Sequence, residues 1–152
     1  MKKNCNLINR LLGVFVLFII VASIAACGGS GGKSVFTKTE TDTTTTLELI
    51  HDKDTITKIN VNSVTDAKSA SEEEQKVAKE MAEAAYKAID GIDVKVDFKD
   101  GKMIMDLSID VEKVKKSSPD MISGMMGVSA DKVGSFEEVK KALLEEGFTE
   151  KK

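Results

Sequence analysis

Apolar and polar residues alternate most regularly between Ile92 and Ile109. Apolar side chains take every second position on both sides of an Asp100-Gly101 pair, which is typical of two strands joined by a two-residue turn that tolerates positive φ. Because a slip of one residue would expose the whole apolar set, the pattern predicts a single register. The predicted pairs on the apolar face are Phe98–Met103, Val96–Met105, Val94–Leu107 and Ile92–Ile109, with Lys95 opposite Asp106 on the other face.

Helical periodicity follows Ser71, which predicts a capping box with Glu74. Gly91 is a candidate left-handed C-cap. Between these residues, apolar side chains recur at helical spacing and form one apolar stripe. Its members are Val77, Ala78, Met81, Ala85, Ala88 and Ile89.

A second helix is predicted to begin after Ser135, with Glu138 completing the same kind of box. Gly147 would end it, and Phe148 would fold back on Leu143 in a Schellman arrangement. The apolar side of this helix is expected to consist of Phe136, Val139, Leu143 and Leu144.

Three strands are predicted before the first helix. The first begins near Ser34, and threonine-rich and apolar segments predict the next two at Thr43–Ile50 and Thr55–Val64. A three-residue loop at Asp52–Asp54 would set Glu48 opposite Lys58, Leu47 opposite Ile59 and Thr45 opposite Val61. With a short irregular segment before the last helix, the prediction is an α+β two-layer sandwich. It has an antiparallel sheet of about five strands and two main helices, in the order β-β-β-α-β-β-α.

The N-terminal segment has the pattern of an export signal. Positive charges at Lys2, Lys3 and Arg10 precede an apolar run from Leu11 to Ala22, which is too short to span a bilayer. The run ends in Ile24-Ala25-Ala26-Cys27, which looks like the lipobox of bacterial lipoproteins. We therefore expect residues 1–26 to be a signal peptide and the thiol of Cys27 to be the lipid-attachment site. This lipid would anchor the domain in the cell membrane, facing outside the cytoplasm.

The rest of the chain is expected to form a glycine-rich tether at residues 27–33 and a single domain at residues 34–152. Lipidation of Cys27 and loss of Cys5 would leave that domain without a thiol for catalysis, metal binding or a disulfide. From residue 27 onward the chain holds all 25 acidic residues and 19 of the 22 basic ones, a net charge near −6. This acidity argues against a nucleic-acid partner.

No residue pattern predicts a metal, a cofactor or a catalytic site. His51 is the sole histidine, and with Asp52 and Asp54 it offers too few ligands for zinc, so we expect a solvated turn. As a catalytic base it would need a nucleophile and an orienting group. Asp97 and Asp100 lack the ligand spacing of a calcium loop.

The methionines offer a sharper alternative, because thioethers suit Cu(I). Met121, Met125 and Met126 lie close together around Gly124. Met is also a flexible filler of cores, so we expect these side chains to pack in a loop across the open end of the core.

Several ordered segments resemble the YehR-like family of small bacterial lipoproteins, a domain of unknown function. They comprise the lipobox ending at Cys27, residues 86–92 (YKAIDGI), residues 108–114 (SIDVEKV), residues 122–124 (ISG), residues 128–130 (VSA) and residues 146–148 (EGF). The resemblance implies an anchored α+β domain with several antiparallel strands and brings no catalytic residues.

The expected function is therefore that of a non-enzymatic, membrane-anchored domain that binds an unknown protein or small-molecule partner. The alternative is an accessory cell-envelope or assembly protein without a small-molecule ligand. An apolar pocket between sheet and helices would favour a small ligand, whereas an exposed apolar patch would favour a protein partner.

Overall fold

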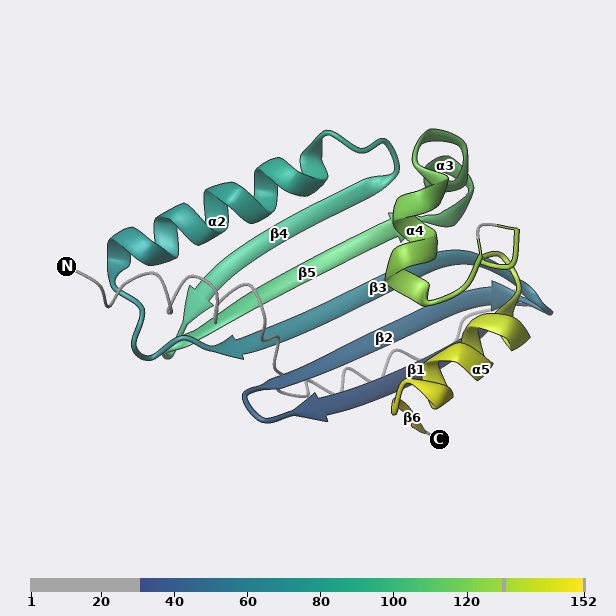
Figure 1. Ribbon diagram of the computed structural model, residues 1–152, viewed down its shortest axis with the longest axis horizontal. Coiled ribbons are helices and arrows are strands. Elements are labelled where there is room, and N and C mark those ends of the chain that lie inside the picture. Colours follow the sequence, from purple (N-terminus) through teal and green to yellow (C-terminus); the bar gives the residue numbers. More distant parts are fainter. Residues whose placement is uncertain (1–30, 130, 152) are drawn as a thin grey trace.

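The computed structural model describes residues 31–129 and 131–151, which form an antiparallel sheet with helices (Figure 1). The strand order is β4-β5-β3-β2-β1-β6. The strands are β1 (Gly31–Glu40), β2 (Thr43–Asp52), β3 (Thr55–Asp66), β4 (Ile92–Lys99), β5 (Lys102–Asp110) and β6 (Thr149–Lys151). The helices are α2 (Glu72–Lys87), α3 (Val111–Ser117), α4 (Pro119–Met126) and α5 (Phe136–Glu145). The α+β prediction is confirmed, with six strands rather than about five, because Thr149–Lys151 pairs with β1.

The β4–β5 hairpin has the predicted register in every pair. Phe98 lies opposite Met103, and Lys95 lies opposite Asp106. The turn residue Asp100 has φ 54° and Gly101 has φ 72°, as a tight hairpin turn requires.

The predicted register between β2 and β3 is wrong by two residues. Glu48 pairs with Asn60 instead of Lys58, and Thr45 pairs with Ser63 instead of Val61. The turn contains two residues rather than three, since Asp52 pairs with Thr55, and a bulge follows where the register shifts after Ile50. A displacement of two residues keeps each side chain on its predicted face, which is why the apolar pattern did not reveal it.

The predicted tether is shorter than expected at its C-terminal end. Gly31 pairs with Asp52 and Gly32 with His51, so residues 31–33 belong to β1 and the strand begins before Ser34. Residues 1–26, including the predicted signal peptide, and Cys27 lie outside the described residues.

Helix α2 begins with the predicted capping box, in which the Ser71 and Glu74 side chains each bond the other's backbone N–H. The predicted apolar stripe is covered only in part, because no residue of α2 is fully buried. The helix lies along the edge strand β4 (Figure 1), and the side chains that pack against the core are Ala78, Ala82, Tyr86 and Ile89. Val77 and Met81 are 49% and 57% exposed.

The segment predicted to be irregular contains the short helices α3 and α4. Asp110 caps α3 by accepting a hydrogen bond from the Lys113 N–H. Pro119 begins α4, and Gly127 ends it in the left-handed conformation with φ 66°. The predicted loop around Gly124 is therefore a helix.

Helix α5 has the predicted ends. The Ser135 side chain accepts a hydrogen bond from the Glu138 N–H. The Phe148 N–H bonds to the Leu143 carbonyl and the Gly147 N–H to the Leu144 carbonyl, which together form a Schellman motif. Leu144 is 46% exposed and does not join the packed side.

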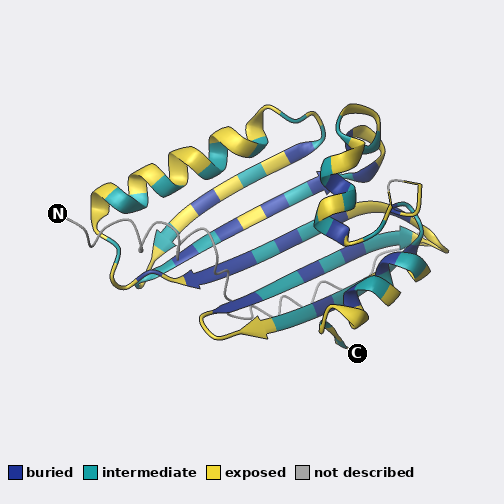
Figure 2. Cartoon of the chain, in the orientation of Figure 1, coloured by how far each residue is buried: buried dark blue, intermediate teal, exposed yellow. Residues whose placement is uncertain are grey.

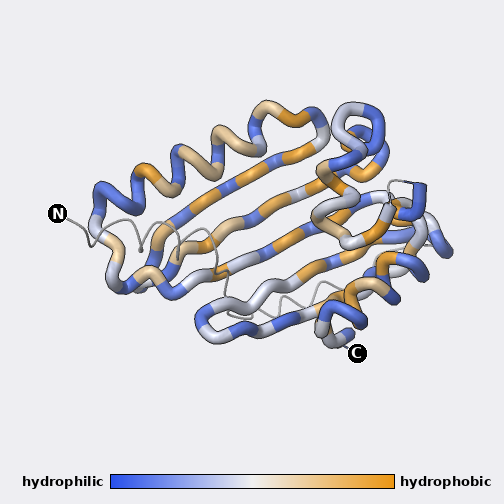
Figure 3. The backbone as a smooth tube through the Cα atoms, viewed as in Figure 1, coloured by the Kyte–Doolittle hydropathy of each residue, from blue (hydrophilic) through white to orange (hydrophobic). Residues whose placement is uncertain are grey.

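The core lies between one face of the sheet and helices α3, α4 and α5. Dark stripes of buried residues alternate with intermediate or exposed ones along the strands in Figure 2, and the hydropathy in Figure 3 alternates in the same way along β4. Fully buried side chains from both layers meet here: Phe36, Leu49, Ile59, Val96, Ile109, Val111, Val114, Ile122, Val133 and Val139. The opposite face carries polar pairs such as Asn62 with Asp106, whose Nδ2 and Oδ1 atoms are 2.7 Å apart.

Candidate functional site

The predicted lipid-attachment residue, Cys27, lies four positions before the first described residue, Gly31. Its chemistry is therefore not part of the geometry that follows. Within residues 31–129 and 131–151, no helix is both long and apolar enough to cross a bilayer.

The His51 side chain is held in place by a stacking contact. Its ring lies on the ring of Phe136 at the start of α5, with 3.9 Å between centroids and 15° between planes. Its Nδ1 lies 2.8 Å from the Lys53 carbonyl oxygen. On the strand side, a Cβ atom at Gly32 would be 2.6 Å from the His51 ring. The turn itself is exposed at residues 52–55, as expected, whereas the His51 ring packs at a junction between β1, β2 and α5.

Asp54 joins the β2–β3 turn to the N-terminus of α5. Its carboxylate accepts hydrogen bonds from the Glu137 N–H and the Ser135 hydroxyl, each at 2.9 Å. The Phe136 N–H bonds to the Asp54 carbonyl at 2.8 Å. The backbone bond from Glu137, followed by the Ser135 hydroxyl, holds the pKa of the Asp54 carboxyl below its usual value. The carboxylate therefore acts as an additional cap for α5.

His51, Asp54 and Ser135 thus lie at one junction. Their hydrogen bonds are those of a helix cap and not those of a catalytic triad. The Ser135 hydroxyl donates to Asp54 and accepts from the Glu138 N–H, so both of its usual roles are occupied by structure. A nucleophilic serine instead donates to the histidine that activates it. His51 directs its Nδ1 to a carbonyl oxygen.

The other candidate ligands do not form a metal centre among the described residues, which hold no group of three or more His, Cys, Asp or Glu suited to a metal ion. Met126 is 3% exposed, and Met121 and Met125 pack against the core. The interpretation of the methionines as core residues is confirmed.

A polar hollow lies where β3, β4 and β5 meet the end of α2 and the start of α3. Its volume is about 700 Å³, and it opens to solvent. Both positively and negatively charged side chains line it, among them Lys58, Lys113, Asp90 and Asp110. Lys113 and Asp110 face each other at 4.0 Å, and polar atoms make up most of the wall. The hollow therefore lacks the apolar lining that usually holds a small ligand.

A second candidate site is the exposed flank of α2, where apolar side chains face solvent. It consists of Val77, Met81, Ala84, Ala85 and Ala88, all exposed and all on one side of the helix. This α2 flank adjoins the side that packs on β4, so the apolar arc of α2 is wider than its contact with the sheet. Figure 2 shows the helix mostly exposed beside the strands that it follows. The sequence pattern showed these residues except Ala84, but it did not show that a helix at the sheet edge leaves part of its apolar side uncovered.

Comparison with known proteins finds the DUF1307 family, described as proteins of unknown function, over residues 33–149. Uncharacterised lipoproteins of Listeria monocytogenes and Listeria innocua are each 26% identical to this chain, over 144 and 145 residues. Both alignments cover 91% of this chain and 94% of the relative.

Among solved structures, the NMR structure of the Escherichia coli YehR protein matches with a TM-score of 0.65 and 20% identity, covering 82% of this chain and 93% of that one. An NMR structure of a Streptococcus pneumoniae protein matches with a TM-score of 0.54 and 9% identity, covering 90% and 94%. These structures show the same fold. The resemblance to the YehR-like family is confirmed.

Proposed function

We propose, from the premise that this chain belongs to the DUF1307 family, that it is a membrane-anchored, non-enzymatic domain that binds a protein partner outside the cytoplasm. The lipoprotein relatives support an anchor, and Cys27 at the end of the lipobox is the residue that would carry it. Two acyl chains on that residue would hold the domain at the membrane without a spanning helix.

The α2 flank is the observation that carries the proposed binding role. Val77 and Met81 are large apolar side chains that are about half exposed on a regular helix. Exposed apolar side chains that form one helical stripe are the pattern by which a helix docks on a protein groove. The neighbouring polar side carries ion pairs, such as Lys87 with Glu83 at 2.5 Å and Lys76 with Glu80 at 3.9 Å. A partner would therefore meet an apolar strip bordered by charges that are paired in part.

A small-molecule ligand has less support. The polar hollow at the end of α2 is open and lined by opposite charges. An accessory envelope or assembly protein without a small-molecule ligand is the alternative function, and it uses the same α2 flank. The nature of the protein that contacts the flank distinguishes the two roles.

The proposal is tested by a photo-crosslinking amino acid placed at Met81 of the anchored protein in its own cells. The control position is Lys95, which is exposed on the open face of the sheet, away from the flank. We expect a discrete adduct with one envelope protein from position 81 and none from position 95. The same adducts from both positions, or none from position 81, would contradict the proposal.

A further inference from the structure

We infer that one end of the domain lies against the surface of the lipid bilayer. This basal end consists of the β2–β3 turn (residues 52–55) and the loop before α5 (residues 132–135). The inference rests on the proposed lipid anchor at Cys27 and adds an orientation to it. It follows from where β1 begins, from how its first residues are held, and from the charge of the domain.

The chain between the anchor and the sheet is very short. Three residues separate Cys27 from Gly31, which already pairs with Asp52 in the sheet. Even fully extended, these four steps reach no more than about 14 Å. Gly31 must therefore stay within that distance of the lipid attachment point, and the β2–β3 turn lies next to it because Asp52 is its partner in the sheet.

The glycines at the start of β1 do not supply extra length. Gly32 lies against the His51 ring, and a Cβ at Gly32 would overlap its Cε1 atom at 2.6 Å. The ring cannot simply move away, because its other contact is the stacked ring of Phe136. The close approach of His51 therefore explains why this position is glycine, and it fixes the strand at Gly32.

The basal end is itself well connected. Thr55 forms an isolated bridge with Ser135, and the Ile56 N–H bonds to the Gly134 carbonyl at 2.9 Å. With the Asp54 contacts to α5, these bonds join the turn to the loop before the helix. The short chain from Cys27 therefore holds a single connected surface, rather than one loose strand end.

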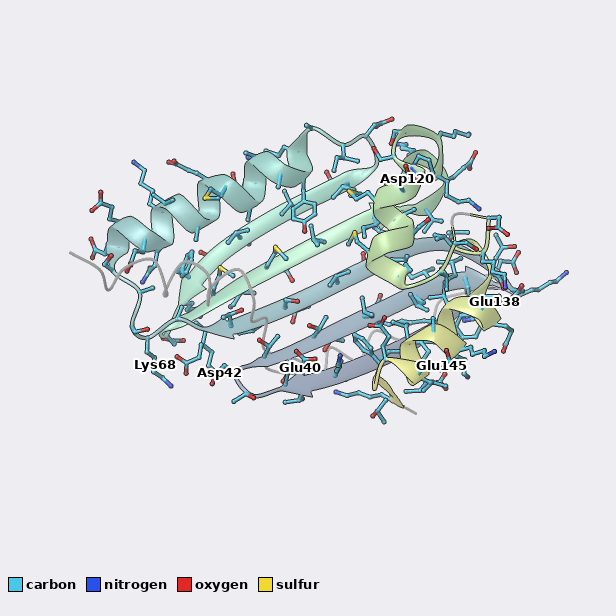
Figure 4. All side chains as sticks on the ribbon, viewed as in Figure 1. Glu40, Asp42, Lys68, Asp120, Glu138 and Glu145 are labelled. Atoms are coloured by element: carbon cyan, nitrogen blue, oxygen red, sulfur yellow. The ribbon has the colours of Figure 1, made fainter. Side chains whose placement is uncertain are left out.

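The opposite end of the strands is directed away from the bilayer. Along the ten residues of β1, Glu40 lies about 30 Å from Gly31. Figure 4 shows Asp42 and Glu138 at opposite ends of the strands, with Glu138 near the basal end. A domain lying on its side would bring more of the acidic groups behind the net charge near −6 close to an anionic bilayer than one held at its basal end. Charge repulsion therefore favours contact through one end.

The experiment uses the lipidated protein in vesicles of phosphatidylglycerol and phosphatidylcholine that contain a headgroup nitroxide lipid as a short-range quencher. A fluorophore is attached to a new thiol in Asp52→Cys or, as the matched probe, in Asp42→Cys. Both positions are exposed, and they flank opposite ends of β2. We expect strong quenching at position 52 and little at position 42. Equal quenching at both positions in protein that floats with the vesicles would overturn the orientation while leaving the anchor intact.

A longer tether provides the control. Inserting twelve Gly and Ser residues between Gly29 and Ser30 should reduce quenching at position 52 to the level at position 42. If quenching at position 52 survives the insertion, the short tether does not hold the basal end and the inference fails. Protein that does not float with vesicles contradicts the proposed anchor itself, and the inference fails with it.

Discussion

The His51 ring stacks on the Phe136 ring, with centroids 3.9 Å apart and planes 15° apart. This contact joins the last residues of β2 to the first residue of α5, which are 85 positions apart in the chain. Lys140 also places its Nζ 5.6 Å from the Phe136 centroid, so the ring is held from two directions. The single histidine is therefore part of the packing at the basal end.

The first prediction concerns the space beneath His51. Gly32→Ala should destabilise the protein by about 1–3 kcal/mol, because its Cβ would overlap a ring that cannot shift without losing its stacking. Gly124→Ala is the control, since its Cβ meets nothing within 4 Å and alanine favours the α4 helix by about 0.5–1 kcal/mol. Urea unfolding measures both. Equal free energies of unfolding for Gly32→Ala and the wild type would contradict the packing described for His51.

The second prediction concerns the pH dependence of stability. The bonds from Glu137 and Ser135 lower the folded pKa of Asp54, so its carboxylate stabilises the fold above the unfolded value near 3.8. That contribution is lost as the pH falls from about 3.8 through the folded pKa. The stability difference between wild type and Asp54→Ala should thus be largest at neutral pH and shrink in acid. Unfolding midpoints between neutral and acidic pH measure this difference.

Asp52→Ala is the control for that experiment. Asp52 is an exposed carboxylate two positions away and does not bond to the start of α5. Its replacement should give nearly the same midpoint as the wild type across the range. A difference for Asp54→Ala that grows on acidification would contradict the assigned direction of the pKa shift.

The third prediction separates the core from the α2 flank. Ile109 is completely buried in β5, so Ile109→Ala should lower the free energy of unfolding by about 2–5 kcal/mol. Val77 is 49% exposed, and Val77→Ala should change it by no more than about 0.5 kcal/mol. Chemical denaturation measures both values. A large loss for Val77→Ala would mean that the flank belongs to the core.

The fourth prediction concerns binding by the α2 flank. The double variant Val77→Gln and Met81→Gln should fold as well as the wild type, because glutamine is a good helix former and both sites are exposed. It should nevertheless lose the adduct formed by a photo-crosslinker at Ala85. The measurement is adduct yield in cells at equal protein level. An unchanged adduct yield would show that the α2 flank is not the binding site.

Sequence pattern predicted those parts of the fold in which periodicity and turn chemistry agree. In the β4–β5 hairpin, alternation on both strands and an Asp-Gly turn leave only one register that buries Val96 and Met105 together. Helix α5 was predicted for a similar reason, since Ser135 and Gly147 define its ends independently of the apolar spacing.

Other features depend on contacts that no local pattern contains. The β2–β3 register changes by two residues with the turn length, and both registers bury the same faces. Strand β6 has only three residues, without a clear alternation of apolar and polar side chains. It forms because its backbone pairs with the free edge of β1. Glycines 31 and 32 have the composition of a linker, and their place in β1 depends on Asp52 and His51.

The candidate interaction surface could be predicted only in part. The apolar residues of α2 are visible in the sequence, but their exposure follows from the place of the helix beside β4 at the sheet edge. Helices α3 and α4 were missed because they have seven and eight residues, too few for a clear period.

Attachment to the membrane through Cys27 can be measured by metabolic labelling with a radioactive fatty acid. Wild-type protein and Cys27→Ser are expressed at equal levels, and the label is read on the isolated protein after removal of free lipid. We expect label on the wild type and none on Cys27→Ser. Label retained by Cys27→Ser, or absent from the wild type, would contradict this attachment.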